Sequence, residues 1–291
     1  MLTAKIRVAK VLLEANRLGL SLPIAKIPAM IISASSYSNT APLVWSFLYG
    51  SKRGEVELIM DNAPARSAEL LSTGAVDAAL VPVIVYQSIA GLNIVPDVCV
   101  GAREKVRSVC LITNGSDIEN AKSVTLDVSS RTSVALTKIL FREFFESEPV
   151  WIEEKPEPEA MLEKADAALI IGDPALAASV SGKFKVFDLV EVWKKLTGFG
   201  FVFAMWMTKR DSLPIRFDEA RDEGLSRVEE IIGNYGDEIS LSHDAFERYL
   251  TEEIVYSTDE SMLAGLDLYF ELAERHGLTE GKAELRFCEL T

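Results

Sequence analysis

The sequence predicts an α/β protein of two lobes, each with a mostly parallel sheet. Short apolar runs alternate with helical patterns along the 291 residues, as expected for βαβ units. Two stretches, GAVDAAL at 74–80 and EKADAAL at 163–169, echo each other, because each follows a helical pattern and leads into an apolar strand. This echo indicates two similar lobes, with a ligand cleft between them.

The strands are predicted where short apolar runs stand between helical patterns. They lie at 30–34, 56–60, 76–81, 108–113, 123–127, 150–153, 167–171, 185–189 and 201–207. The first predicted helix covers 41–49, with Thr40 as its cap, Pro42 in its first turn and Gly50 as its stop. Two further helices are predicted over 64–73 and 131–145.

The chain is expected to cross between the two lobes twice. We place these crossings in the strands at 108–113 and 201–207, so lobe 1 comprises residues 30–112 and 203–291 and lobe 2 residues 113–202. From residue 215 onward the chain is rich in helical patterns, and its last apolar stripe ends at Gly277. We expect this helical tail to pack on lobe 1, and the two crossings to form a hinge.

Residues 1–29 precede the first predicted strand and are interpreted as an N-terminal extension. Glu14 and Arg17 interrupt its apolar run before it reaches the length of a secretory core or a membrane span. Two alternatives stay open for it. It is either a short amphipathic helix outside the fold or a stretch upstream of the true start at Met30.

The composition is that of a globular protein with a sizeable core, 48% hydrophobic and 25% charged. Lys and Arg total 30 against 44 Asp and Glu, and the formal charge of −14 opposes binding to a phosphate backbone. The three cysteines are widely spaced, which argues against a disulfide framework. We therefore expect a cytoplasmic protein with no nucleic-acid or membrane partner. The composition does not fix its oligomeric state.

The usual metal and cofactor motifs are missing from the sequence. The two histidines, His243 and His276, both lie in the helical tail, and neither belongs to a cluster with metal-ligand spacing. A GxGxxG motif after a strand and a GxxxxGK[ST] motif are both absent. We therefore expect no metal and no cofactor.

Two polar turns at the ends of predicted strands are candidates for holding an anion. The first contains Ser36, Tyr37 and Thr40, and the second contains Arg131, Thr132 and Ser133. Free backbone N–H groups and the helix dipole attract carboxylates at such places. Each turn also fits plain helix capping, and that alternative stays open.

Two further positions complete the set of candidate site residues. Asp173 lies in a polar turn after the strand at 167–171, where it fits either a binding role or a helix cap. Ser108 begins a predicted strand and has no neighbouring base in the sequence, so hydrogen bonding suits it better than nucleophilic attack.

Five segments, taken in order, resemble the chorismate dehydratases of the futalosine route to menaquinone. They are ISASSYSNTAPL at 32–43, VRSV at 106–109, SRTSVAL at 130–136, ADAALIIGDPAL at 165–176 and FVFAMW at 201–206. The resemblance implies a type II periplasmic-binding-protein fold turned to catalysis. It also implies that chorismate is the small-molecule substrate and is converted to 3-[(1-carboxyvinyl)oxy]benzoate and water. In this family the residues at Asn39 and Ser108 are associated with substrate binding and catalysis.

The chain departs from the family pattern at two places. Ser38 stands where the family often has Leu, and VIVY at 83–86 stands where many members have Ser-Ile-Glu-Tyr, so that glutamate is not available as a base. We therefore hypothesise that the enolpyruvyl carboxylate of the substrate takes the proton, while the protein orients it. Two alternatives stay open: a non-catalytic binding protein for small carboxylates, and the sister enzyme 1,4-dihydroxy-6-naphthoate synthase, which depends on a cleft histidine.

Overall fold

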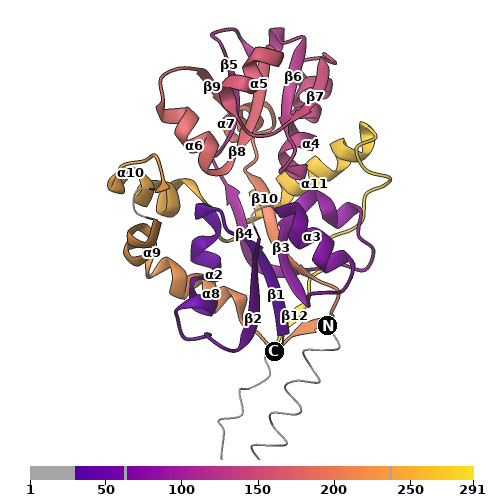
Figure 1. Ribbon diagram of the computed structural model, residues 1–291. Coiled ribbons are helices and arrows are strands. Elements are labelled where there is room, and N and C mark those ends of the chain that lie inside the picture. Colours follow the sequence, from indigo (N-terminus) through magenta and orange to yellow (C-terminus); the bar gives the residue numbers. More distant parts are fainter. Residues whose placement is uncertain (1–29, 62–63, 236–237) are drawn as a thin grey trace, which may run out of the picture.

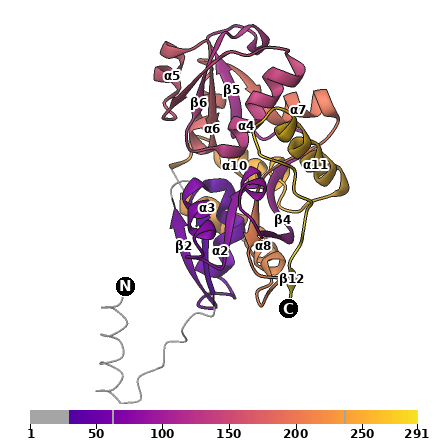
Figure 2. The same ribbon diagram turned by 90° about the vertical axis from the view of Figure 1, so that its right-hand side faces the viewer.

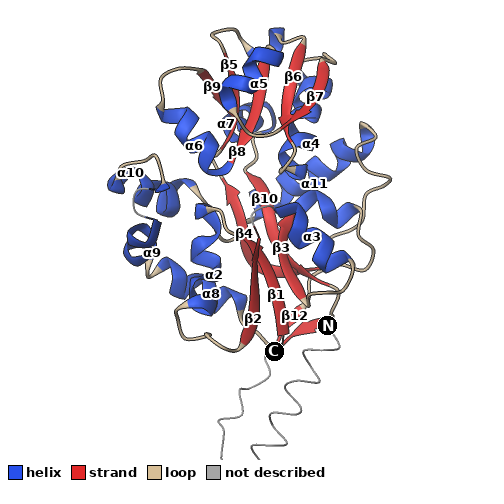
Figure 3. Ribbon diagram, viewed as in Figure 1, coloured by secondary structure: helices blue, strands red, loops and turns tan. Residues whose placement is uncertain are grey.

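The computed structural model describes residues 30–61, 64–235 and 238–291. The predicted extension, residues 1–29, lies outside the described residues. The described chain forms two lobes, each built on a five-stranded sheet with helices on both faces (Figures 1 and 3). Lobe 1 is the lower one in Figure 1 and lobe 2 the upper one.

The sheet of lobe 1 has the strand order β2-β1-β3-β10-β4, with β10 antiparallel to both of its neighbours. Its strands are β1 (Met30–Ser35), β2 (Val56–Asp61), β3 (Ala78–Pro82), β4 (Asn93–Ala102) and β10 (Phe201–Thr208). Strand β4 was not predicted. Pro96 and Asp97 interrupt its apolar pattern, and Asp97 has a left-handed backbone with φ 54°.

The sheet of lobe 2 repeats this order as β7-β6-β8-β5-β9, and β5 is antiparallel to β8 and β9. Its strands are β5 (Val109–Thr113), β6 (Ser123–Asp127), β7 (Val150–Glu154), β8 (Ala167–Ile171) and β9 (Lys185–Asp188). The echoed stretches lead into β3 and β8, the central strands of the two sheets. In each, the aspartate accepts backbone N–H groups at the start of the neighbouring strand: Asp77 from Ile31 at 2.8 Å and Asp166 from Ser123 at 3.0 Å.

The crossings between the lobes lie in short irregular segments at 103–108 and 198–200. Strand β5 pairs only with strands of lobe 2, and β10 only with strands of lobe 1. The crossings were expected inside these strands, with lobe boundaries at 112 and 203. The structure instead places all of β5 in lobe 2 and all of β10 in lobe 1. The first crossing is held by Asp188, whose Oδ2 accepts N–H groups of Val106 (2.8 Å) and Arg107 (2.6 Å).

The helices cover both sheets, and among the described residues no helix is both long and apolar enough to cross a membrane. The predicted helix at 131–145 forms, although its second part is π-helical. The helices are α2 (Ala41–Leu48), α3 (Pro64–Ser72), α4 (Arg131–Ile139) continuing as η4 (Leu140–Phe144), α5 (Pro158–Lys164), α6 (Gly172–Val180), α7 (Leu189–Thr197), α8 (Phe217–Leu225), α9 (Val228–Tyr235), α10 (His243–Arg248) and α11 (Glu260–Arg275). Two short segments also contribute residues near the cleft, the 3-10 helix η1 (Ser38–Thr40) and the π-helix η6 (Tyr249–Glu253).

The helical tail packs on lobe 1, as predicted: α8 lies against α2 and β4, and α11 lies against β10. Its last helix also contacts lobe 2, because α11 packs on α4 (Figure 2). The Tyr269 hydroxyl of α11 donates to the Thr132 carbonyl at 3.0 Å. The tail therefore braces both lobes at the first turn of α4.

Candidate functional site

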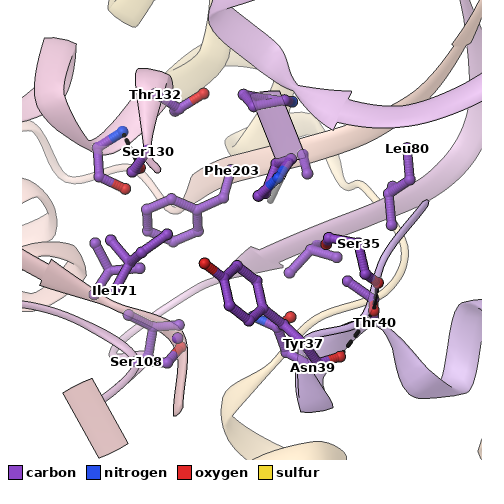
Figure 4. A pocket seen from close by; sticks show the side chains of 18 residues that line it. Ser35, Tyr37, Asn39, Thr40, Leu80, Ser108, Ser130, Thr132, Ile171 and Phe203 are labelled. Carbon is purple, nitrogen blue, oxygen red and sulfur yellow. Dashed lines mark hydrogen bonds between the residues drawn. The ribbon is translucent and has the colours of Figure 1, made fainter. Parts of the chain in front are cut away.

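A cavity lies between the lobes, at the carboxyl ends of parallel strands from both sheets (Figure 4). Lobe 1 contributes Ser35 at the end of β1 and Leu80 in β3, and lobe 2 contributes Ile171 at the end of β8. Open α/β sheets commonly bind ligands at this edge. The position therefore agrees with the cleft expected from the echoed lobes.

The lining of the cavity is apolar, with a few polar groups pointing into it. Leu80, Val100, Ile171 and Phe203 supply the apolar part. The polar groups are Tyr37, Asn39, Ser108, Ser130 and Thr132 (Figure 4). Such a lining suits a small molecule with an apolar ring and few polar substituents.

Three residues of the first predicted turn line the cavity: Tyr37, Asn39 and Thr40. The Thr40 hydroxyl is used locally, because it donates to the carbonyls of Ser35 (2.6 Å) and Tyr37 (2.8 Å). Thr40 thus shapes the turn, while Tyr37 and Asn39 face the cavity. Ser36 was expected to bind substrate, but it is exposed and lies outside the lining.

The second predicted turn forms the first turn of α4. Thr132 and Ser133 line the cavity, and the cap residue Ser130 accepts the Ser133 N–H at 3.2 Å. The positive end of the helix dipole therefore faces the cavity and favours a carboxylate there. Arg131 differs from the expectation. It is exposed and lines grooves outside the cavity, because consecutive helical residues point about 100° apart.

Ser108 lines the cavity but is fully buried, and its Oγ has no hydrogen-bond partner among the described residues. Its position is fixed by the backbone. The Ser108 carbonyl accepts the Gly172 N–H at 2.7 Å, and the Ser108 N–H donates to the Val106 carbonyl at 2.6 Å, across the left-handed Arg107 (φ 53°). A buried hydroxyl without a partner is available to a ligand.

Tyr249 of η6 is a neighbour of the site that the sequence analysis missed. It is buried, and its hydroxyl lies near the side chains of Ser108 and Asn39. The contact with Ser108 does not have the geometry of a regular hydrogen bond, but both neighbours act to lower the Tyr249 pKa. Burial outweighs them and raises the pKa of Tyr249 well above its ordinary value. The residue comes from the tail, more than a hundred positions from both partners, so no local pattern indicates the contact.

Asp173 does not line the cavity but joins the lobes beside it. Its Oδ1 accepts the Ser38 hydroxyl at 2.5 Å. Burial raises the pKa of Asp173 above its ordinary value, and the Ser38 hydrogen bond opposes this only in part. The expected contact of Asp173 with substrate is therefore replaced by a contact with Ser38.

Neither histidine lines the cavity. His276 contacts Glu143 at 2.8 Å, and His243 is exposed on α10 beside Glu229. The expectation that neither histidine belongs to a cluster with metal-ligand spacing is wrong for His243. Among the described residues, its side chain lies close enough to Glu229 and Glu247 for the three to hold a metal ion, and all three are exposed. The chemistry available in the cavity is thus hydrogen bonding, helix-dipole attraction and apolar enclosure.

The fold and the cleft define a protein of the periplasmic-binding-protein-like class. The aliphatic sulphonate binding protein SsuA of Escherichia coli is 20% identical, with a TM-score of 0.61 over 88% of this chain and 90% of that one. A protein of Archaeoglobus fulgidus is 16% identical, with a TM-score of 0.67 over 86% of this chain and 98% of that one. These likenesses show the fold.

The chain belongs to the menaquinone biosynthesis family, whose model matches residues 30–275. A chorismate dehydratase of Thermus thermophilus is 30% identical in an alignment 228 residues long, and the match covers 69% of this chain and 79% of that protein. The family resemblance predicted from the five segments is confirmed.

Proposed function

We propose that the protein is a chorismate dehydratase, which converts chorismate to 3-[(1-carboxyvinyl)oxy]benzoate and water. One observation carries this proposal: Asn39, Ser108 and the first turn of α4 line the same largely apolar cavity. Membership of the menaquinone biosynthesis family and the likeness to the Thermus enzyme support it. A cytoplasmic location stays part of the proposal.

Two groups of polar residues in the lining can each take one of the two carboxylates of chorismate. The N–H groups and dipole of α4, with Thr132 and Ser133, hold one carboxylate. Asn39 and Ser108, from opposite lobes, orient the enolpyruvyl carboxylate or the hydroxyl that leaves. The Phe203 and Leu80 side chains enclose the ring and exclude water from it.

The elimination breaks one C–H and one C–O bond of the ring. The described residues that line the cavity include no histidine and no carboxylate, so the enolpyruvyl carboxylate of the substrate takes the ring proton. The electron pair of that C–H bond forms the new double bond, and the neighbouring hydroxyl leaves with the proton as water. The ring becomes aromatic, which drives the step. The protein contributes positioning and electrostatic stabilisation.

Incubation of the purified protein with chorismate tests the proposal. We expect an aromatic product in the ultraviolet spectrum, with the mass of chorismate less one water. The Asn39→Ala variant is expected to lose on the order of 100-fold in rate, the usual cost of an oriented polar group. Activity of this variant within about threefold of wild type would contradict the role of Asn39.

Other outcomes distinguish the remaining functions. Tight binding of chorismate without product would indicate a binding protein of the kind that the fold also serves. Turnover of a cyclic futalosine derivative instead of chorismate would indicate 1,4-dihydroxy-6-naphthoate synthase. That enzyme depends on a cleft histidine, and the described lining of this cavity contains none.

A further inference from the structure

Ser38 and Asp173 form a contact between the two lobes, beside the cavity. Ser38 in η1 belongs to lobe 1 and is fully buried, and its Oγ donates to Oδ1 of Asp173 in lobe 2 at 2.5 Å. Both side chains lie outside the cavity lining, yet their chain neighbours Asn39 and Gly172 are part of it. The contact therefore sets the distance between the two walls of the site.

Asp173 is also tied to Ser108. The Gly172 N–H donates to the Ser108 carbonyl at 2.7 Å, and strand β8 runs beside β5 in register, with Ile171 opposite Val109. A continuous path thus runs from Ser108 through Gly172 and Asp173 to Ser38 and on to Asn39. The two residues proposed to act on the substrate stand at its ends.

A second contact of the same turn also crosses the cleft. The Tyr37 hydroxyl lies 3.3 Å from the Ser129 hydroxyl, which donates to Oδ1 of Asp127 at 2.6 Å. Adjacent residues of one turn therefore each reach a carboxylate of lobe 2. Ser38 contacts the half-buried Asp173 directly, and Tyr37 reaches the buried Asp127 through Ser129. Hydrogen bonds at two points fix both the distance and the rotation of the turn against lobe 2.

We propose that Asp173 is a positioning residue, which accepts the Ser38 hydrogen bond when the lobes close and so holds Asn39 opposite Ser108. This inference rests on the proposed dehydratase function and gives Asp173 a role different from substrate binding. Ser38 stands where the resembled family often has Leu, which cannot donate a hydrogen bond. In this chain the serine at position 38 can donate a hydrogen bond, and Asp173 accepts it.

Kinetics of three single variants and one double variant test the inference. Asp173→Ala and Ser38→Ala are each expected to lower kcat for chorismate by about 10- to 100-fold with a smaller change in KM, the scale of a hydrogen bond to a charged group. Asp173→Asn keeps an acceptor for Ser38 and is expected to restore most of kcat. The double variant Ser38→Ala/Asp173→Ala is expected to be no slower than either single variant, because one contact is lost in all three.

Three kinetic results would overturn the inference. Loss of turnover in Asp173→Asn with binding intact would make Asp173 the base. A double variant slowed by the product of the two single effects would show that the residues act separately. Single variants within about threefold of wild type would show that the contact does not matter.

Lobe closure is measured independently of turnover, with spin labels on Glu57→Cys in lobe 1 and Glu119→Cys in lobe 2. Both positions are exposed, whereas Cys99, Cys110 and Cys288 are buried, so labelling is selective. With 3-[(1-carboxyvinyl)oxy]benzoate bound, we expect a longer inter-label distance in Asp173→Ala than in wild type, and the wild-type distance in Asp173→Asn.

The two readouts separate the two proposals. A wild type that closes but does not convert chorismate would contradict the dehydratase function alone. An active wild type whose distance distribution is unchanged by Asp173→Ala would contradict the positioning role. Urea unfolding of each variant shows whether it is folded under the assay conditions.

Discussion

Ser108 combines complete burial with a hydroxyl that has no partner among the described residues. We expect Ser108→Ala to lower kcat/KM for chorismate by on the order of 100-fold, because an oriented hydrogen bond to the reacting group is lost. Ser36→Ala is the matched control, since Ser36 is exposed and outside the cavity lining, and it should keep wild-type kinetics. Equal activities of the two variants would contradict the assignment.

Asp173 is expected to make the stability of the folded protein depend on pH, and the sign of this dependence follows from the burial of its carboxyl. Its pKa is raised in the folded protein, chiefly by burial, and the hydrogen bond from Ser38 opposes this rise. The other titratable groups that face Asp173 are Glu238, Tyr37, Tyr235 and Tyr249. The folded state thus holds the proton to higher pH than the unfolded chain, whose Asp pKa is about 3.9. The contribution to stability is complete below that value and is lost as pH rises through the folded pKa.

Asp173→Asn stays neutral at every pH and should not show this decline. Urea unfolding of wild type and variant between pH 4 and pH 7 checks it. We expect the stability of the variant relative to wild type to increase with pH. A parallel slope for wild type and Asp173→Asn would show that this carboxyl is not perturbed.

At the level of single residues, the sequence predicted the cavity wall better than the roles within it. Thr132 and Ser133 were chosen because they begin a helix after a strand, and the ends of strands meet at the cleft. Asn39 lies in such a turn as well, but its catalytic role and that of Ser108 came from the family resemblance. Side-chain direction is what the pattern lacks. Arg131 points away from the cavity, and Tyr249 arrives from the distant tail, because both depend on packing rather than on local sequence.

The β8–α6 junction depends on Gly172, whose φ is 66°. A Cβ here would lie 3.1 Å from the Tyr37 ring. We expect Gly172→Ala to lower the free energy of unfolding by about 1–2 kcal/mol through backbone strain. It should also lower activity at least tenfold, because Tyr37 is displaced from the cleft.

Gly182 provides the matched control for this change. Its φ is 67°, but a Cβ at this position would have nothing within 4 Å. Gly182→Ala should therefore show a similar loss of stability with unchanged kinetics. The free energy of unfolding and kcat/KM are measured for both variants. Equal kinetic losses in both would mean that strain alone, and not the Tyr37 contact, explains the effect.

Elements with an unbroken apolar run were predictable, and elements interrupted by special backbone were not. Strands β6 and β8 have the predicted bounds. Strand β4 was missed because Pro96 and Asp97 interrupt its apolar pattern. The first crossing between the lobes was placed a few residues too far along the chain, because the apolar strand β5 follows it directly. Its true location depends on the long-range contact of Asp188 with the Val106 and Arg107 N–H groups, which no local pattern contains.

The whole molecule is expected to unfold in one step. One core cluster of buried side chains is continuous across both lobes, from Ile32 and Trp206 in lobe 1 to Leu126 and Trp193 in lobe 2. Tryptophan fluorescence and far-ultraviolet circular dichroism should therefore give coincident urea transitions. Separate transitions would show that the lobes unfold independently.

Product binding should stabilise this single unit, because only the closed folded state joins both cavity walls. At 100 times its Kd, 3-[(1-carboxyvinyl)oxy]benzoate is expected to add about 2.7 kcal/mol to the free energy of unfolding. Benzoate, which lacks the enolpyruvyl carboxylate, is the control ligand and should add much less at the same concentration.

The position of β10 has a consequence for synthesis on the ribosome. Lobe 2 is continuous in the chain from β5 to β9, whereas the sheet of lobe 1 receives β10, the strand between β3 and β4, only after lobe 2 is complete. Until then β3 and β4 lack the strand that joins them and expose unpaired edges. The lobe encoded in the middle of the chain is therefore expected to fold first, and the nascent segment from β1 to β4 is the part that most needs protection by chaperones.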